Sequence, residues 1–267
     1  MYKMRESNPE EALTATAALA MLDKISDLVD LGLLKTENGR FRYLYAMDAK
    51  VDLLLEIENP ELAHETALEA VEFSCNFENE KVDHLKWSGL RLKALKDLVK
   101  SKIAMGDASG VVETTKQIRD LLSEDGDISG TQPEANRNRE RTLLWALEKE
   151  IDQLAKLGRF EEAIDQIHQR WKIVFISPPF AGQRRYYSGA LQMAQTLALW
   201  TESENFSSDD YEVAKTEAIE WLELAFKNKH TTNGDLLDDE VWNPFRESEK
   251  FLEIQNRYGN TSGRKND

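Results

Sequence analysis

The sequence predicts an all-α protein made of antiparallel helical hairpins, with a short capping helix near the C-terminus. Apolar residues recur at spacings of three and four along most of the chain, which is the period of one face of a helix. The 267 residues include only 13 glycines and 6 prolines, and alternating runs of Val, Ile and Thr are scarce. Helix-breaking residues and strand patterns are therefore both rare, as an all-helical chain requires.

The stretch 157–163 is the clearest indication of a helical hairpin. Gly158 follows a helix with an apolar stripe, in the position where a glycine commonly ends a helix. Phe160 is placed to fill the corner, and Glu161 and Glu162 then open a second helix, where the helix dipole favours negative charge. A glycine, an aromatic residue and two acids in this order predict a tight turn between two packed helices.

The first part of the chain is expected to contain three helices. Pro9 suits the first turn of a helix over about 10–31. After a turn at 36–39, a second helix spans about 41–57, and Pro60 restarts the chain. Small residues at spacings of four and three then let two helix backbones approach closely: Ala63, Ala67 and Ala70.

Two more helices and a linker are expected before residue 139. A helix over about 81–105 carries an apolar stripe and ends at a corner at Gly106, and a return helix follows to about residue 122. Residues 123–138 are rich in acids and turn residues, which predicts a flexible internal linker. The predicted hairpins span about 10–57, 58–122, 139–176 and 184–228.

The C-terminal half is expected to contain two of these hairpins and the cap. Residues 172–176 fit either the end of a buried helix or a short extended segment. The acids at 209–210 open the last long helix, and the aromatic piece at 236–257 should fold back over it as a capping helix. The polar tail at 259–267 is expected to be disordered. One helical repeat domain over 1–258, with an internal linker, accommodates all of these segments.

The corner Gly158-Arg159-Phe160-Glu161-Glu162-Ala163-Ile164 resembles the corner and second helix of a tetratricopeptide repeat (TPR). Ala63-Ala67-Ala70 and Ala218-Leu222-Ala225 resemble the pattern of the family's second helix. Arg170 departs from it, since the family prefers a small residue there. The inner residues of four second helices are about 50 residues apart, wider than the ~34 of a standard repeat: Ala63, Val111, Ala163 and Ala218. The resemblance implies a right-handed TPR-like solenoid.

The C-terminus is similar to the closing segment of bacterial TPR proteins. The similarity lies in 218–226, in 239–246 and in Phe251. It extends in particular to the TPR tails that follow kinase domains in some bacterial serine/threonine kinases. Residues 118–121 only faintly echo a kinase catalytic loop, and no Gly-rich phosphate loop occurs in the sequence. The resemblance therefore implies a relative of such tails with the kinase domain absent.

Nine residues on the predicted first helices are candidates for a partner-binding groove, because the resemblance implies that these helices line a concave face. Lysines share one face of the helix at 81–105, and acidic and aromatic residues share faces of the helices before and after it. The candidates are Tyr45, Asp48, Asp52, Lys93, Lys96, Lys100, Trp145, Glu148 and Asp152. This surface suits a peptide carboxylate or acidic side chains, and the alternative is an ordinary solvated helix face. The residue set of chaperone-binding TPR clamps is not reproduced.

The net charge of −15 argues against nucleic acid and anionic membranes as partners, since both would be repelled. No stretch approaches the ~18 apolar residues of a membrane span, and residues 1–11 lack the apolar core of a signal peptide. Cys75 is the single cysteine, which excludes an intrachain disulfide. These features predict a cytoplasmic protein.

No cofactor or metal site is expected. Asp125, Asp127 and Gly130 match the start of a calcium loop, but Pro133 interrupts it and Asn136 stands where a bidentate acid is needed. The four histidines are scattered singly, so they form no zinc-binding pair. We therefore prefer a flexible acidic linker to a calcium site.

These observations together predict a protein-protein interaction scaffold and not an enzyme. The scaffold would bind a peptide or partner helix of unknown identity on its concave face. The alternative is a non-catalytic regulatory segment related to kinase TPR tails, which positions substrates or self-associates.

Overall fold

The computed structural model describes residues 36–75, 84–124, 133–176, 185–201, 208–228 and 237–259, together with Ala20 and Lys24. Every element within these residues is helical, which confirms the all-α prediction for this part of the chain. Apart from Ala20 and Lys24, the helix expected at about 10–31 lies outside the described residues, as do the acidic loop at 125–130 and residues 260–267 of the expected tail.

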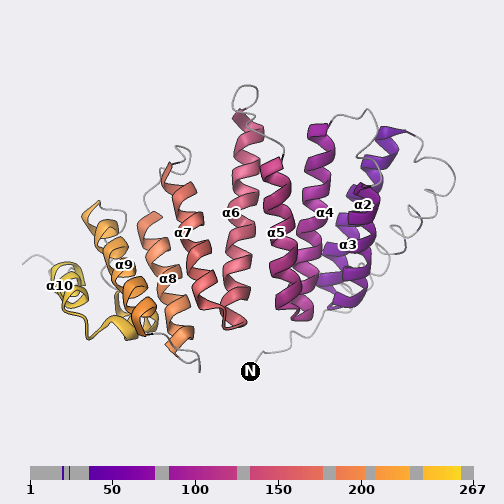
Figure 1. Cartoon of the computed structure of the whole chain (residues 1–267). Coiled ribbons are helices and arrows are strands. Elements are labelled where there is room, and N and C mark those ends of the chain that lie inside the picture. Colours follow the sequence, from indigo (N-terminus) through magenta and orange to yellow (C-terminus); the bar gives the residue numbers. More distant parts are fainter. Residues whose placement is uncertain are drawn as a thin grey trace, which may run out of the picture. The chain divides into compact units, whose positions relative to one another are not determined.

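The helices form two compact units, which we describe separately. Unit 1 comprises Met1–Gly126, and unit 2 comprises Asp127–Asp267. The boundary lies within the stretch 123–138 that the sequence indicated as a linker. The α-helices of both units are labelled in Figure 1.

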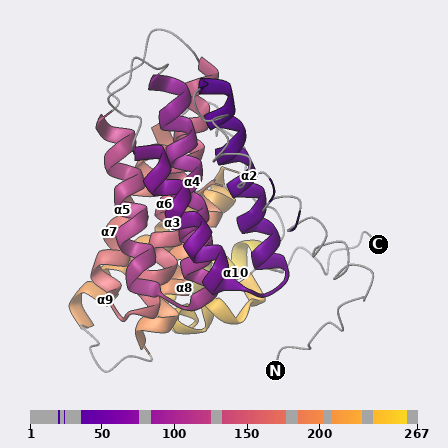
Figure 2. The same cartoon turned by 90° about the vertical axis from the view of Figure 1, so that its right-hand side faces the viewer.

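Unit 1 consists of helices that pack against their neighbours in chain order. The elements are α2 (Glu37–Glu56), α3 (Pro60–Cys75), α4 (His84–Met105) and α5 (Ala108–Glu124). Helix α3 packs against both α2 and α4, and α2 also contacts α4 directly (Figures 1 and 2). A tight corner at residues 57–59 joins α2 to α3, and another at residues 106–107 joins α4 to α5.

Helix α2 begins earlier than the sequence indicated. The expected turn at 36–39 is the N-terminus of the helix, with Thr36 as its N-cap. The Thr36 hydroxyl oxygen accepts a hydrogen bond from the Gly39 N–H at 3.1 Å. This bond satisfies one of the amides that the first helical turn leaves without a partner, so the helix starts at Glu37 instead of Phe41.

Three helical corners share one backbone conformation. Glu58, Gly106 and Gly158 all have positive φ, at 57°, 75° and 72°. The N–H of each donates to the carbonyl three residues earlier, at 3.1 or 3.2 Å. The N–H of the following residue donates to the carbonyl five residues before it, at 2.9 Å in all three corners. These bonds define a Schellman motif, which the described residues contain twice in unit 1 and once in unit 2.

The core of unit 1 forms where α2, α3 and α4 meet. Small residues on α3 allow close approach, and Ala63 and Ala67 are fully buried against the larger side chains of the neighbouring helices. The buried cluster comprises Val51, Leu54, Ala63, Ala67 and Leu98. A second cluster toward the start of α2 and α4 comprises Tyr43, Leu44, Met47, Ala70, Trp87, Leu90 and Ala94. The three helices are therefore held together along most of their length by apolar burial.

Unit 2 also consists of helices that pack in succession. The elements are α6 (Pro133–Lys156), α7 (Phe160–Ile176), α8 (Arg185–Thr201), α9 (Ser208–Lys227), η4 (Glu240–Phe245) and α10 (Glu249–Tyr258). The C-terminal boundary of the linker expected at 123–138 is wrong, because α6 already starts at Pro133. Proline suits this first helical position because its φ is fixed near the helical value. Residues 172–176 belong to α7, so the helical alternative is confirmed there.

The C-terminal cap of unit 2 is built from aromatic residues. Trp242, Phe245 and Phe251 are fully buried, and the rings of Trp242 and Phe245 lie 5.4 Å apart. Helix η4 packs against α8, and α10 packs against α9. The cap expected at 236–257 is thus two short helices instead of one.

Candidate functional site

The nine candidate residues lie in two places, one in each unit. Six of them lie on α2 and α4 of unit 1: Tyr45, Asp48, Asp52, Lys93, Lys96 and Lys100. The other three lie on α6 of unit 2: Trp145, Glu148 and Asp152. We call the first group, together with Asp97, the α2–α4 face.

At one end of the α2–α4 face, the ammonium group of Lys93 lies between a carboxylate and an aromatic ring. Lys93 Nζ lies 2.8 Å from Asp48 Oδ2 and 4.8 Å from the centroid of the Tyr45 ring. The Tyr45 side chain itself is 56% exposed. The lysine of α4 therefore reaches across to α2 and does not form the separate lysine patch that the sequence indicated.

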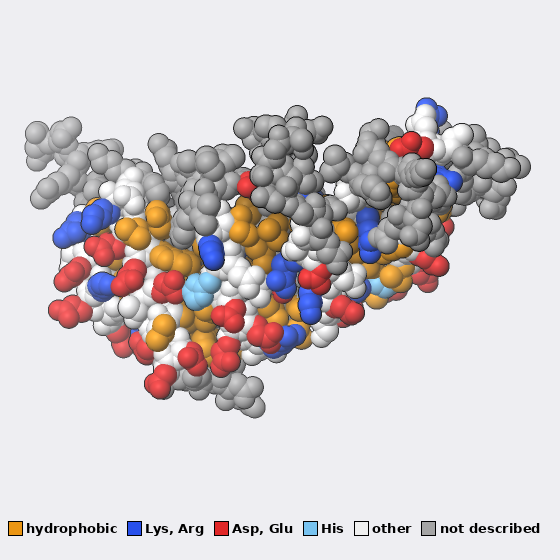
Figure 3. All heavy atoms as spheres, turned by 45° about the horizontal axis from the view of Figure 1, so that its top comes forward, with side chains coloured by type: hydrophobic (Ala, Val, Ile, Leu, Met, Phe, Trp, Pro, Cys, Tyr) orange, Lys and Arg blue, Asp and Glu red, His pale blue; other side chains and the backbone are white. Residues whose placement is uncertain are grey.

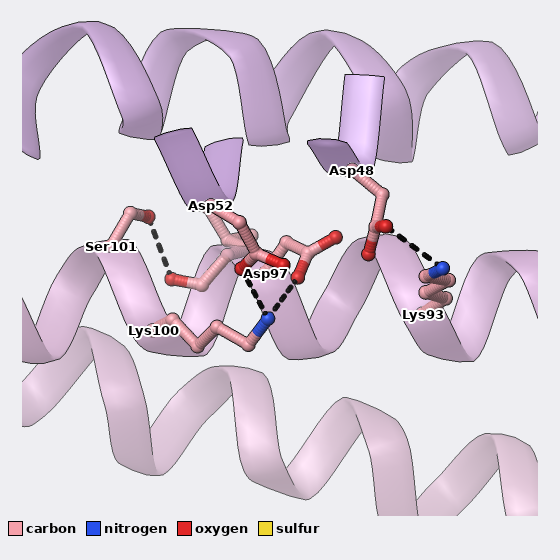
Figure 4. A network of polar contacts seen from close by, with 7 residues as sticks. Asp48, Asp52, Lys93, Asp97, Lys100 and Ser101 are labelled. Atoms are coloured by element: carbon pink, nitrogen blue, oxygen red, sulfur yellow. Dashed lines mark hydrogen bonds and ion pairs between the residues drawn. The ribbon is translucent and has the colours of Figure 1, made fainter. Parts of the chain in front are cut away.

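The other end of the face is a lysine shared by two acids. Lys100 Nζ lies 2.8 Å from Asp52 Oδ1 on α2 and 2.8 Å from Asp97 Oδ1 on α4 (Figure 4). Asp52 has 58% of its side chain exposed, whereas Asp97 has 3%. One cation thus links an exposed acid to a buried one.

The sequence reasoning missed Asp97. The available signal was its spacing of four from Lys93 and three from Lys100, which places all three residues on one helix face. Periodicity assigns Asp97 to the edge of the apolar stripe of α4. It does not show that α2 covers this edge and buries the carboxyl group.

Burial dominates the ionisation of this face. Desolvation raises the pKa of Asp97 to about 7, and the Asp48 carboxylate adds to the rise, while Lys100 opposes it. Desolvation also lowers the pKa of Lys96, and the charge of Lys100 lowers it further. For Lys100, burial disfavours the charged form, but hydrogen bonds to Asp52 and Asp97 outweigh it and its pKa is raised.

A narrow crevice opens beside these charges. It is lined by Leu44, Asp48, Ala70, Leu90, Lys93, Ala94 and Asp97. Its interior has no room for a water molecule. The crevice is therefore a seam between packed helices, with two carboxyl groups along it, and not a cavity for a small ligand.

One candidate residue of unit 2, Glu148, pairs with an arginine of the next helix. Arg170 Nη2 on α7 lies 2.9 Å from Glu148 Oε2 on α6, and its Nη1 donates to Gln192 Oε1 on α8 at 2.7 Å. The guanidinium also lies 5.4 Å from the centre of the Trp171 ring. Arg170 thus connects three helices through its side chain.

Charges near this arginine are partly desolvated. Burial lowers the pKa of Arg170, and the carboxylates of Glu148 and Asp152 oppose that shift. Burial raises the pKa of Asp152, which lies one turn after Glu148 on α6. Trp145 is half-buried on the same helix. The three α6 residues that were candidates for the partner-binding groove are therefore partly buried between helices and only partly exposed to solvent.

The surfaces of both units are mixed in chemistry. On the face shown in Figure 3, acidic, basic and hydrophobic side chains are interspersed. Within the described ranges, no group of three or more His, Cys, Asp or Glu side chains is placed to hold a metal ion. None of the helices in these ranges is long and apolar enough to cross a membrane. No protein-family model matches the sequence, and no curated protein matches it either.

Proposed function

We propose that this protein is a non-catalytic scaffold made of TPR-like helical hairpins, and that the α2–α4 face of unit 1 binds a peptide or a helix of a protein partner. The observation that carries the proposal is the exposed Tyr45 ring beside a row of alternating acids and lysines on two helices of successive hairpins. Exposed aromatic side chains next to charged groups are typical of the residues that dominate protein interfaces.

The repeated corners support a hairpin array. The same Schellman motif follows α2, α4 and α6, and the residue five positions after each left-handed residue is fully buried: Ala63, Val111 and Ala163. The same local geometry and a buried residue at the same place after three corners support a repeated hairpin architecture. A right-handed TPR-like solenoid remains our proposal for the arrangement of these hairpins.

One ion pair of the face is suited to exchange with a partner. The Lys100–Asp52 pair has side chains that are 37% and 58% exposed, and a surface ion pair of this kind stabilises a fold by only about 0–1 kcal/mol. A partner cation that replaces Lys100 at Asp52 would therefore disrupt little of the fold, whereas Asp48, at 19% exposed, is less accessible for exchange at Lys93. The mixed charge favours a partner segment that itself carries both signs.

The second reading is a regulatory segment related to kinase TPR tails that positions substrates or self-associates. Its basis is the closing segment around Trp242 and Phe245, and both side chains are fully buried in the cap. Because Trp242 and Phe245 are buried, packing of the cap is enough to explain why the sequence has them. We therefore prefer the general scaffold to the regulatory segment. The cytoplasmic location and the bacterial origin stay predictions from the sequence.

Affinity capture from cell extract tests the proposal. The bait is the full chain, compared with the Tyr45→Ala/Lys93→Glu double variant, and enriched proteins are identified by mass spectrometry. We expect at least one protein that the wild type captures and the double variant loses. The matched control is Lys116→Glu, the same charge reversal at an exposed lysine of α5, which should retain the partner. Equal capture by all three baits would show that this face is not the binding site.

A further inference from the structure

The corners that end α2, α4 and α6 place three residues of each helix in the same register. The shared positions lie thirteen, ten and six residues before the left-handed residue of each corner, a spacing that puts them on one side of a helix. Helices α2 and α6 both have an aromatic residue and two acids there, and α4 has three lysines. The residues are Tyr45, Asp48 and Asp52 on α2, Lys93, Lys96 and Lys100 on α4, and Trp145, Glu148 and Asp152 on α6. We call the last three the α6 triad.

The contacts of unit 1 show what an aromatic residue and two acids in this register bind. Lys93 of α4 places its ammonium group 4.8 Å from the centre of the Tyr45 ring and 2.8 Å from Asp48 Oδ2. Lys100, seven residues further along α4, places its Nζ 2.8 Å from Asp52 Oδ1 (Figure 4). A helix with lysines seven residues apart therefore contacts the aromatic ring and both acids at once.

In unit 2, the helix packed beside α6 carries no such lysines. Helix α8 contacts α6 directly, as α4 contacts α2. The single charged residue in the sequence of α8 is Arg185, at its first position. Glu148 pairs instead with Arg170 of α7, which also reaches Gln192 of α8. One acid of the α6 triad is thus held by a cation of α7, and α8 supplies none in the pattern of α4.

The other acid of the α6 triad, Asp152, forms no ion pair within the described parts of the chain. It is exposed to solvent, and Lys149 and Lys156 of the same helix act on it through their charge alone. The Lys149 ammonium group lies 3.4 Å from Glu148 Oε1 instead. Trp145 is half-buried, so part of its side chain is accessible. The α6 triad therefore presents to solvent the same two kinds of group that hold lysines on α2.

We propose that the α6 triad is a second docking face, which binds a helix of a protein partner with lysines in the spacing of α4, Lys-x-x-Lys-x-x-x-Lys. The first lysine of the partner lies over the Trp145 ring, and the last lysine pairs with Asp152. Lys93 and Lys100 make the corresponding contacts on α2. Among aromatic side chains, tryptophan attracts a cation most strongly.

Charge complementarity favours this partner over an acidic one. The net charge of −15 attracts cationic segments and repels anionic ones. A lysine at Asp152 also leaves the pair between Arg170 and Glu148 in place. The α6 triad shares no residue with the α2–α4 face, so binding at either face is independent of binding at the other.

Photo-crosslinking of a model helix to the full chain tests this docking face. The probe is an alanine-based helical peptide with lysines at i, i+3 and i+7 and the photoreactive residue p-benzoylphenylalanine at i+4, on the same side of the helix. Irradiation and mass spectrometry should give crosslinks to α6. A peptide of identical composition with lysines at i, i+2 and i+5 scatters them around the helix, and its yield should be about fivefold lower. Equal yields from the two peptides, or crosslinks that avoid α6, would overturn the proposal.

Variants of the chain test the residues involved. Asp152→Asn should lower the crosslink yield to α6 by about fivefold, since it removes the acid that pairs with the last lysine. The matched control Asp165→Asn makes the same change at an exposed acid of α7 and should keep the yield of the wild type. Equal yields from these two variants would contradict the proposal.

A second variant keeps the test decisive if Asp152→Asn fails to fold. Trp145→Leu retains an apolar side chain but removes the ring, so its crosslink yield should also fall, and an unchanged yield would exclude the proposed contact. The Tyr45→Ala/Lys93→Glu double variant should crosslink to α6 as the wild type does. A loss of partners at the α2–α4 face is thereby distinguished from a failure of the α6 triad.

Discussion

Arg170 Nη2 on α7 lies 2.9 Å from Glu148 Oε2 on α6, and the same guanidinium donates to Gln192 on α8. Arg170 thus carries a side chain that joins three helices of unit 2. The arginine side chain is 18% exposed and that of Glu148 is 41% exposed. The pair is therefore partly solvated, and its loss should cost less than that of a fully buried ion pair.

Replacing the arginine by an apolar residue of similar length tests this relationship. We expect Arg170→Met to lower the free energy of unfolding of unit 2 by about 1–2 kcal/mol, because two hydrogen bonds are lost while the packing of the stem is largely kept. Chemical denaturation followed by tryptophan fluorescence measures the effect. In a double-mutant cycle with Glu148→Gln, additive effects would contradict direct coupling of the two side chains.

The corner at Glu58 should be improved by glycine. Glu58 adopts a positive φ of 57°, whereas Gly106 and Gly158 occupy the same position in the other two corners. A side chain in the left-handed region is strained, so Glu58→Gly should stabilise unit 1 by about 0.5–1 kcal/mol after the added entropy of the unfolded glycine is counted. Thermal unfolding measures this change. The reciprocal substitution Gly158→Ala should destabilise unit 2 by about 1 kcal/mol, and a stable Gly158→Ala variant would contradict the shared geometry.

Gly189 of α8 is expected to tolerate no side chain. A Cβ at this position would lie 2.9 Å from Trp171 Cε2 and 3.0 Å from Trp221 Cε3, both in large rings that cannot yield easily. Gly189→Ala should therefore lower the stability of unit 2 by about 1–3 kcal/mol through overpacking. The matched control is Gly89→Ala on α4, where an added Cβ meets no heavy atom within 4 Å. That variant should be neutral or more stable, since alanine favours a helix more than glycine does. Equal effects of the two substitutions in a melting experiment would rule out this explanation.

The hairpin corners could be predicted from the sequence because their signals are local. Gly106 and Gly158 provide the positive φ that ends a helix, and both corners were expected where they occur. The turn predicted at 36–39 was wrong because a Thr36 cap and the start of a helix use the same polar residues as a loop. Local chemistry therefore indicates a helix end but does not always distinguish a cap from a turn.

The pairing of charges across helices could not be predicted in the same way. Helical spacing placed Lys93 and Lys100 on one face of α4 and Asp48 and Asp52 on one face of α2, as the structure has them. Periodicity along one helix contains no information about which other helix covers that face. Direct packing of α2 against α4 turns the expected lysine patch into ion pairs and buries Asp97.

Site-specific photo-crosslinking tests most directly whether the α2–α4 face binds a protein partner. The photoreactive residue p-benzoylphenylalanine replaces Tyr45, which is 56% exposed, and in a control protein it replaces Leu68 of α3, which is 45% exposed in the same unit. Irradiation in cells should give a discrete crosslinked protein from position 45 that is missing from position 68. Identical products from the two positions, or no product from position 45, would contradict the proposed binding face.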